Sequence, residues 1–440
     1  MIRAALLSPR GRLALVSGAA LAIRLVYGLF VHPPFSFLRS DASGYISRAQ
    51  DLLDGKWSPD PQATFFPYGT HYLLAAALGV SGRAEWSVGV SWALLASGAV
   101  AFTFLAAERL LAGSPRAALT VGLALAVYPP WIEHAGFALS ETPTAFCVAV
   151  ATWSAMRLSQ EGRRRDALYL GAALAVGVAL RPQIVLSAMA LAVVLIWRGR
   201  RLPGITWRAG ALAALPLVLV LGFSAGRVRY HTGHLGLVST NGAFNYALGR
   251  CHAHTLSATR TPRSAFQPPG FLRLWRFREK SGVDPFPPLD PAFGPELTFD
   301  GQLWDEEPAR GLAKRCVAET GPLRQARYSL SHIVLLWAYN VPWPSTGPVA
   351  MVSSFAHALL LLPGLLVALV RSLRKEHALA LTASVHVFAL LAVAMAFFGE
   401  ARLRLPYDGI IVMLAVWVYA DWLARLRARR AGPLVASQPG

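Results

Sequence analysis

Long apolar runs, separated by short polar breaks, make up most of the chain. A helix needs about 20 apolar residues to cross the roughly 30 Å hydrocarbon core of a membrane. The runs predict about ten membrane-spanning helices, some of them short, near residues 12–32, 86–107, 117–132, 142–159, 167–181, 183–198, 207–225, 347–370, 377–398 and 408–426. We therefore predict an all-α polytopic membrane protein whose spans form a helical bundle.

The polar breaks differ in charge, and this difference predicts how the chain lies in the membrane. Arginine gathers in alternate breaks, which is typical of cytoplasmic loops; these breaks lie near residues 3–12, 108–116, 161–165, 197–204, 371–375 and 425–430. We expect a multi-pass protein of an inner or plasma membrane with both termini in the cytoplasm. No small-residue cleavage site follows the first span, so we expect it to be a retained anchor.

The apolar part of residues 65–82 bears on this topology. It is too short to cross a membrane comfortably, and a crossing here would turn every later cationic break outward. We therefore predict a juxtamembrane helix within a first external loop of residues 33–85, followed by a second external loop at 128–143. The chain then divides into an N-terminal membrane module (1–225), a small extracytoplasmic cap (226–346) and C-terminal membrane helices (347–440).

Composition narrows the class of protein. Apolar residues make up 55% of the chain and charged residues only 15%, which is not the composition of a soluble enzyme. The net charge of +19 would suggest nucleic acid in a soluble protein, but here the arginines fall mainly in the cytoplasmic breaks. We therefore expect membrane lipids, and no nucleic acid, as partners.

The first external loop begins with a short amphipathic helix. Apolar residues recur there at helical spacing, Ser40 or Asp41 can cap the start, and Gly55 ends the pattern. Asp51 and Asp54 are expected as solvated charges on its polar face. Asp41 lies closest to the first span, so it is either a helix cap or a reactive carboxylate that faces a cavity.

The predicted cap contains two cysteines and a pair of closely spaced histidines. In an oxidising compartment Cys251 and Cys316 could form a disulfide, and a pair of free thiols is the alternative. His252 and His254 lack a third ligand at a convincing spacing, so we predict no zinc site.

Several motifs follow one another along nearly the whole chain. After the external helix and an apolar "YLLAAAL" segment come "FALSETPTAF" (137–146), "GVALRPQ" (177–183), "HLGLVSTNGAFNYALGR" (234–250) and "GEARLRLPYDG" (399–409). In this order they resemble the polyprenyl-phosphate-sugar-dependent glycosyltransferases of the GT-C superfold, in particular the protein mannosyltransferase and aminoarabinose transferase group of glycosyltransferase family 39. The resemblance implies a GT-C bundle and a sugar donor carried on a polyprenyl phosphate.

The resemblance also implies a catalytic residue in each of the first two external loops. The essential acid of the first loop corresponds to Asp41, and the second acid corresponds to Glu141. Sugar transfer needs a carboxylate that takes the acceptor proton and cations that stabilise the departing phosphate. A single base predicts inversion at the sugar. Because Ser40 and Ala42 flank Asp41 where the family shows a more acidic motif, no metal site is assigned, and a divalent cation such as Mg or Mn is left open.

The remaining candidates are substrate-binding residues. Arg181, Arg402 and Arg404 are expected to hold the phosphate, with interfacial snorkelling or a structural ion pair as the alternative. Glu400 can orient one of these arginines. The resemblance places Asn241, Asn245 and Tyr246 near the sugar or acceptor, although a plain turn leading to a surface segment also fits them. Tyr45, which lies on the same predicted helix as Asp41, is also expected to bind substrate.

The predicted function is therefore transfer of a sugar from a polyprenyl-phosphate donor to an acceptor hydroxyl or amine on the extracytoplasmic face. The acceptor can be a glycan, a lipid or a protein. Two alternatives come from other classes: a flippase or transporter of lipid-linked glycans, which should carry charges at the middle of its spans, and a non-catalytic scaffold of cell-envelope assembly.

Overall fold

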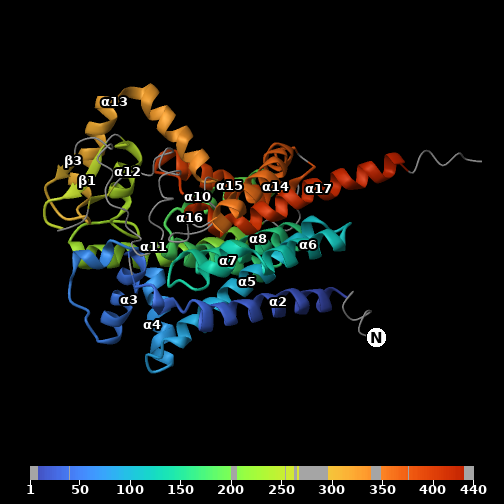
Figure 1. Ribbon diagram of the computed structural model, residues 1–440, viewed down its shortest axis with the longest axis horizontal. Coiled ribbons are helices and arrows are strands. Elements are labelled where there is room, and N and C mark those ends of the chain that lie inside the picture. Colours follow the sequence, from blue (N-terminus) through green and yellow to red (C-terminus); the bar gives the residue numbers. More distant parts are fainter. Residues whose placement is uncertain are drawn as a thin grey trace, which may run out of the picture.

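The computed structural model describes residues 8–38, 40–199, 206–252, 254–261, 265–266, 296–337, 348–374 and 376–430. Helices dominate these residues, as Figure 1 shows. The longer helices are α2 (Pro9–Val26), α5 (Trp86–Leu110), α6 (Pro115–Ala126), α8 (Glu141–Glu161), α9 (Arg164–Leu180), α10 (Ile184–Gly199), α11 (Trp207–Thr232), α13 (Glu306–Leu335), α14 (Pro348–Ser372), α15 (Ala378–Ala396) and α17 (Asp408–Arg430). The predicted all-α class is confirmed.

Shorter elements connect the long helices. One π-helical turn, η1 (Tyr27–Val31), continues α2. The other short elements are the α-helices α3 (Ser40–Leu53), α4 (Tyr68–Val80), α7 (Pro129–His134), α12 (Gly242–Arg250) and α16 (Ala401–Arg404), and the 3-10 turns η2 (Pro34–Ser36), η3 (Pro61–Thr64) and η6 (Leu405–Tyr407).

Each predicted span overlaps a helix, but the helices differ in length, and the span predicted at 117–132 is divided between α6 and α7. Among the described residues, six segments are long and apolar enough to cross a membrane on their own: Pro9–Ser36, Trp86–Leu110, Trp207–Thr232, Phe355–Ser372, Ala378–Ala396 and Ala401–Arg430. Two predicted spans form shorter apolar helices, α6 and α10. The stretch predicted to be juxtamembrane forms α4, which has 13 residues.

The bundle has two chemically different ends (Figure 1). The first residues of α2 and the last residues of α17 lie at one end, and α3, α4 and α12 lie at the other. Arginines at the first end form ion pairs that tie neighbouring helices together: Arg12 with Glu108 at 2.6 Å, Arg109 with Glu161 at 2.5 Å, and Arg371 with Asp421 at 3.0 Å.

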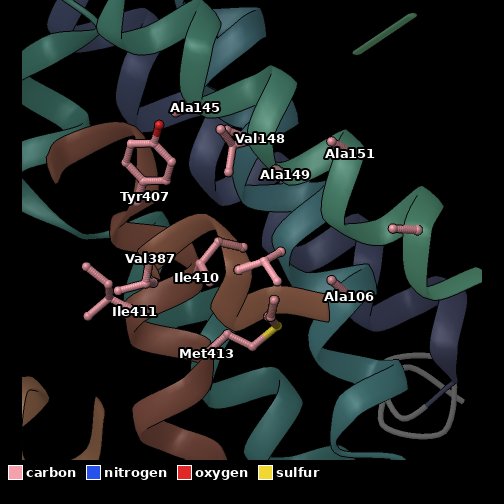
Figure 2. Close-up of a cluster of buried hydrophobic side chains, with 14 of the residues drawn as sticks. Ala106, Ala145, Val148, Ala149, Ala151, Val387, Tyr407, Ile410, Ile411 and Met413 are labelled. Carbon is pink, nitrogen blue, oxygen red and sulfur yellow. The ribbon is translucent and has the colours of Figure 1, made fainter. Parts of the chain in front are cut away.

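The bundle core is built largely from small and β-branched side chains. Figure 2 shows α8 presenting Ala145 and Val148 to Tyr407 and to the first turns of α17. Ile410 and Met413 of α17 are almost completely buried there. Small residues let helix backbones approach closely in a membrane, where packing takes the place of hydrophobic exclusion. The start of α17 is therefore fixed against α8.

The residues predicted to form the cap, 226–346, include a small sheet as well as helices. The strands β1 (Thr255–Ala258), β2 (Ala265–Phe266) and β3 (Glu296–Phe299) form one sheet in the order β2-β1-β3, with β1 antiparallel to β2 and parallel to β3. A disulfide joins Cys251, just after α12, to Cys316 of α13. The Pro-rich residues 267–295 lie outside the described residues.

Arg24 explains why α6 ends where it does. This arginine is fully buried in α2, and its guanidinium donates hydrogen bonds to the Ala126 and Leu125 carbonyls at 2.9 and 3.0 Å. The last carbonyls of a helix have no partner within the helix. Arg24 supplies donors for two of them, so α6 can stop after 12 residues inside the bundle.

We predict that Arg24→Met destabilises the protein by about 1–3 kcal/mol, because buried carbonyls lose their donors. Thermal unfolding in detergent measures the change. Arg10→Met, at an exposed position of the same helix, is the control and should leave the midpoint unchanged. Equal midpoints for both variants would contradict this role for Arg24.

Candidate active site

Four segments that are distant in sequence meet at the end of the bundle opposite the arginine-rich end. They are the first turn of α3, the first turn of α8, the residue after α9, and α16. They bring Asp41, Glu141, Arg181 and Arg402 into one network of ion pairs.

The helix that carries Asp41 forms as its sequence pattern predicts. Ala42, Tyr45, Ile46 and Ala49 are all buried on one face of α3. This face packs against α4, and the ring of Tyr45 lies 5.0 Å from that of Phe66. Asp41 in the first turn is thus held on a fixed helix. Its side chain keeps 30% of its surface exposed.

Glu141 and Arg181 owe their positions to two helix ends. Glu141 is the first residue of α8, where an acidic side chain interacts favourably with the helix dipole. Arg181 precedes Pro182, and a residue before proline is disfavoured in the helical conformation. The helix α9 therefore ends at Leu180, and the Arg181 backbone is extended.

Arg181 and Glu141 form a buried ion pair. The Arg181 Nη2 donates to Glu141 Oε1, and its Nε donates to the hydroxyl of Ser140 at 2.9 Å. Behind them the indole of Trp92 donates to the Leu139 carbonyl at 3.0 Å, which fixes the backbone that leads into α8. The side chain of Glu141 is fully buried and that of Arg181 is 8% exposed.

Arg402 connects the two carboxylates. Its Nη2 donates to Asp41 Oδ2 at 2.6 Å, and its Nε donates to Glu141 Oε1. The segment before it, residues 397–400, runs close to α13: a Cβ on Gly399 would lie 1.8 Å from the carbonyl oxygen of His332. Glycine at position 399 therefore permits the close approach that brings Arg402 to the site.

The surrounding charges determine the protonation of these groups. Burial alone would raise the pKa of the Glu141 carboxyl, but Arg181 and Arg402 outweigh it and lower the pKa to about 2. Burial raises the pKa of Glu400 above its ordinary value. Burial, together with Asp41 and Glu141, also raises the pKa of Tyr45. Glu141 is therefore ionised at neutral pH, and Tyr45 is a neutral phenol.

The structure brings some of the other predicted residues near this network. Tyr246 of α12 stacks edge-on against Phe397, with ring centroids 6.0 Å apart, and so lies beside the segment that carries Glu400. Asn241 is the residue just before α12, and its side-chain oxygen accepts a hydrogen bond from the Ser239 hydroxyl at 2.9 Å. Asn245 lies within α12 and donates its backbone N–H to the Asn241 carbonyl.

Arg404 does not join the network. It is fully buried, and its Nε donates to Asp408 Oδ1 at 2.8 Å. Its Nη1 donates to the Leu336 carbonyl at 2.8 Å. Its predicted role as a phosphate ligand stays a prediction, and the site described here does not include it.

Sequence patterns did not single out two other groups near this end. His134 of α7 is buried next to Glu141, and burial lowers its pKa to about 4. A second set of basic side chains lies further along α3: Arg48 pairs with Asp60 at 2.6 Å, and buried Arg227 of α11 and His71 of α4 lie near it. Arg227 follows a predicted span directly, where an arginine is ordinarily an interfacial anchor.

The arrangement of the acids does not fit a metal ion. Within the described ranges, no group of three His, Cys, Asp or Glu side chains is placed to hold one. Asp41 and Glu141 both bind the Arg402 guanidinium, so a divalent cation would have to displace that arginine.

We predict that Glu141→Gln destabilises the protein by about 3–5 kcal/mol, because it leaves buried cations without their anion. The Glu141 pKa is lowered from 4.5 to about 2 in the folded protein, so its stabilising effect is present above pH 4.5 and is lost as the pH falls toward 2. Thermal midpoints measured from pH 7 to 3 should fall less in the variant than in the wild type.

Glu108→Gln, at the ion pair with Arg12 in the opposite end of the bundle, is the control and should keep the wild-type pH dependence. The interpretation would be wrong if Glu141→Gln and the wild type lost stability equally on acidification.

Residues 66–223 match the sequence model of the family described as dolichyl-phosphate-mannose-protein mannosyltransferase. The match includes α4, Glu141 and Arg181 and ends within α11. A comparison with curated proteins found no match.

Solved structures with a similar fold include the oligosaccharyltransferase from Archaeoglobus fulgidus. Its AglB structure in complex with an inhibitory peptide and a dolichol-phosphate aligns with a TM-score of 0.52 and 12% identity over 97% of this chain and 52% of that one. The apo form aligns with a TM-score of 0.54, 13% identity and the same two coverages. The present chain thus spans about half the length of these proteins.

ArnT from Cupriavidus metallidurans, bound to undecaprenyl phosphate, aligns over 98% of this chain and 82% of that one, with 16% identity and a TM-score of 0.41. Because this TM-score is lower, the fold assignment rests on the two oligosaccharyltransferase structures. The chain is a multi-pass membrane protein with the GT-C fold, and over residues 66–223 it carries the sequence pattern of the dolichyl-phosphate-mannose-protein mannosyltransferase family.

Proposed function

We propose that this protein is a membrane glycosyltransferase that moves a sugar from a polyprenyl phosphate to an acceptor hydroxyl or amine. The observation that carries the proposal is the network of Asp41, Glu141, Arg181 and Arg402. It holds a partly exposed carboxylate beside a partly exposed guanidinium, at 30% and 15% exposure, so a base and an anion-binding group lie side by side and both keep solvent access.

Asp41 is the proposed base. The acceptor oxygen or nitrogen attacks the anomeric carbon of the donor sugar, and the bond from that carbon to the phosphate oxygen breaks. The acceptor proton passes to the Asp41 carboxylate late in the reaction, when the attacking group has become more acidic. A single displacement of this kind inverts the configuration at the anomeric carbon.

Arg402 is the proposed ligand of the leaving phosphate. Negative charge grows on the phosphate as the bond breaks, and a guanidinium already held in position stabilises it without reorganisation. Arginine suits this role because its planar group can donate two parallel hydrogen bonds to phosphate oxygens. Arg181 adds a second positive charge behind Arg402, through their shared contact with Glu141.

Glu141 has a positioning role in this proposal. Its side chain is fully buried, so it does not compete with Asp41 for the acceptor proton. One of its oxygens holds both arginines. Its negative charge also offsets part of the cost of burying two cations when no donor is bound.

The orientation in the membrane follows from the two ends of the bundle. Arginines cluster where α5 and α8 end and where α9 begins, which is the pattern of a cytoplasmic face. The network of Asp41 lies at the opposite end, which we assign to the extracytoplasmic side. A lipid-linked donor would then reach the site laterally from the outer leaflet.

The transporter alternative predicts charges at midmembrane that bind a substrate. The buried Arg24 instead donates to main-chain carbonyls of α6. This contact is a structural one, and it favours the enzyme over the transporter.

We predict that purified protein in nanodiscs transfers radiolabelled sugar from at least one member of a panel of polyprenyl-phosphate sugars, or hydrolyses it slowly. Asp41→Asn should lower the rate by about 100-fold or more, because general-base catalysis contributes this much. The matched control is Asp51→Asn on the same helix, where the acid pairs with Lys56 at 2.9 Å; its rate should equal that of the wild type.

A folded Asp41→Asn variant with the wild-type rate would contradict the assignment of the base. A wild type that binds polyprenyl phosphate but turns over no donor, with affinity unchanged by Asp41→Asn, would favour a transporter or scaffold. An added EDTA arm checks that turnover persists without free divalent ions.

A further inference from the structure

We infer that Asp408 and Arg404 are positioning residues that hold Arg402 in the active site. The inference rests on the proposed function for its kinetic consequences, but its geometric basis does not depend on that function. Asp408 and Arg404 form an ion pair of 2.8 Å, and neither side chain has any exposed surface.

Arg402 and Arg404 point to opposite sides of one short helix. Residues two apart on an α-helix are rotated by about 200° relative to one another. Arg402 accordingly contacts Asp41 and Glu141, whereas Arg404 contacts Asp408 and the Leu336 carbonyl. The rotation of α16 about its axis therefore sets both contacts together.

The helix α16 cannot fix its own orientation. It has four residues, and helices shorter than about 12 residues are marginal without tertiary contacts. Its anchors lie immediately after Arg402: the buried ion pair, and a hydrogen bond of 2.9 Å from the indole of Trp131 to the Leu405 carbonyl. Arg402 lies on the partly exposed side of α16. The contacts on the buried side of α16 therefore set the direction in which Arg402 points.

Asp408 is in turn held from a separate part of the bundle. Its Oδ2 accepts a hydrogen bond of 2.9 Å from the Tyr128 hydroxyl, which also lies 2.8 Å from the Nδ1 of buried His357 on α14. The next residue, Gly409, approaches Trp131 so closely that a Cβ there would lie 2.6 Å from the indole ring. The start of α17 is thus a rigid base for the Arg404 contact.

Loss of the Asp408 charge should release this arrangement. Arg404 would remain as a buried cation without its anion, which is strongly unfavourable. The helix α16 would rotate or shift to hydrate Arg404, and Arg402 would leave its two carboxylates. The Glu141 carboxyl would then lose one of the two guanidinium groups that keep it ionised, and it would accept a proton at a higher pH.

The groups that face the Glu141 carboxylate come from every neighbouring element. They are Arg181 after α9, Arg402 of α16, His134 of α7, Asp41 and Tyr45 of α3, and Glu400 before α16. Of these, only Arg402 belongs to the helix that Arg404 anchors. Glu400 directly precedes that helix and would move with it. A shift of the acid limb of the pH–rate profile therefore reports on a movement of α16, and with it of Arg402.

The test compares wild type, Asp408→Asn and the double variant Arg404→Met/Asp408→Leu. The double variant removes both charges, and replacing a buried ion pair by apolar residues is often neutral for stability, so it should fold even if the single variant does not. We expect kcat to fall by about 10- to 100-fold in each folded variant, because small misplacements of catalytic groups cost this much. We also expect the acid limb of the pH–rate profile to move to higher pH.

A second readout does not need turnover. Carbodiimide labelling with an amine, followed by mass spectrometry, measures how accessible the Asp41 carboxyl is, and it should rise severalfold when Arg402 moves away. Asp421→Asn, at the far end of α17 where Asp421 pairs with Arg371 at 3.0 Å, is the control and should match the wild type in every readout.

The inference is overturned if folded Asp408 variants keep the wild-type pH profile and the wild-type labelling of Asp41. If the wild type transfers no sugar while labelling still rises in the variants, the positioning role stands and the proposed function fails. These two results separate the failure of one hypothesis from the failure of the other.

Discussion

The architecture depends on positive and negative side chains that are paired where water reaches them only in part or not at all. Arg402 bridges Asp41 and Glu141, and Glu141 also binds Arg181. In water such ion pairs contribute little, but in a buried setting each partner is strongly unfavourable without the other. The network therefore requires α3, α8, α9 and α16 to meet with a defined geometry, and the surrounding helices supply it through small side chains that allow close packing.

The site is supported in successive layers. Asp41 and Arg402 keep some solvent access, Glu141 and Arg181 lie behind them, and the Arg404–Asp408 pair lies on the opposite side of α16. Each layer is less exposed than the one in front of it. Solvent access falls in this order, so the strength of electrostatic interactions rises. The exposed groups can respond to a substrate while the buried ones keep their positions.

Local patterns predicted much of this arrangement. The apolar spacing from Ala42 to Ala49 was sufficient to define α3, and Pro182 explains why α9 stops before Arg181. Sequence could not separate Arg402 from Arg404, because both lie in one polar break and only the rotation of a four-residue helix assigns them to different partners. The partners of Arg24 could not be predicted either, because they are main-chain carbonyls of α6, which every residue type carries.

The short α6 bears on how a helix end can meet lipid. At 1.5 Å per residue, its 12 residues rise only about 18 Å, well short of the roughly 30 Å apolar layer. Two non-helical residues, Val127 and Tyr128, separate α6 from α7, and unpaired peptide groups are not tolerated against lipid. Val127 is exposed at the surface of the bundle, but the N–H groups of Val127 and Tyr128 donate to carbonyls of α6, and Arg24 binds the carbonyls of Leu125 and Ala126. A buried cation thus lets the end of a short helix lie against acyl chains with these peptide groups paired.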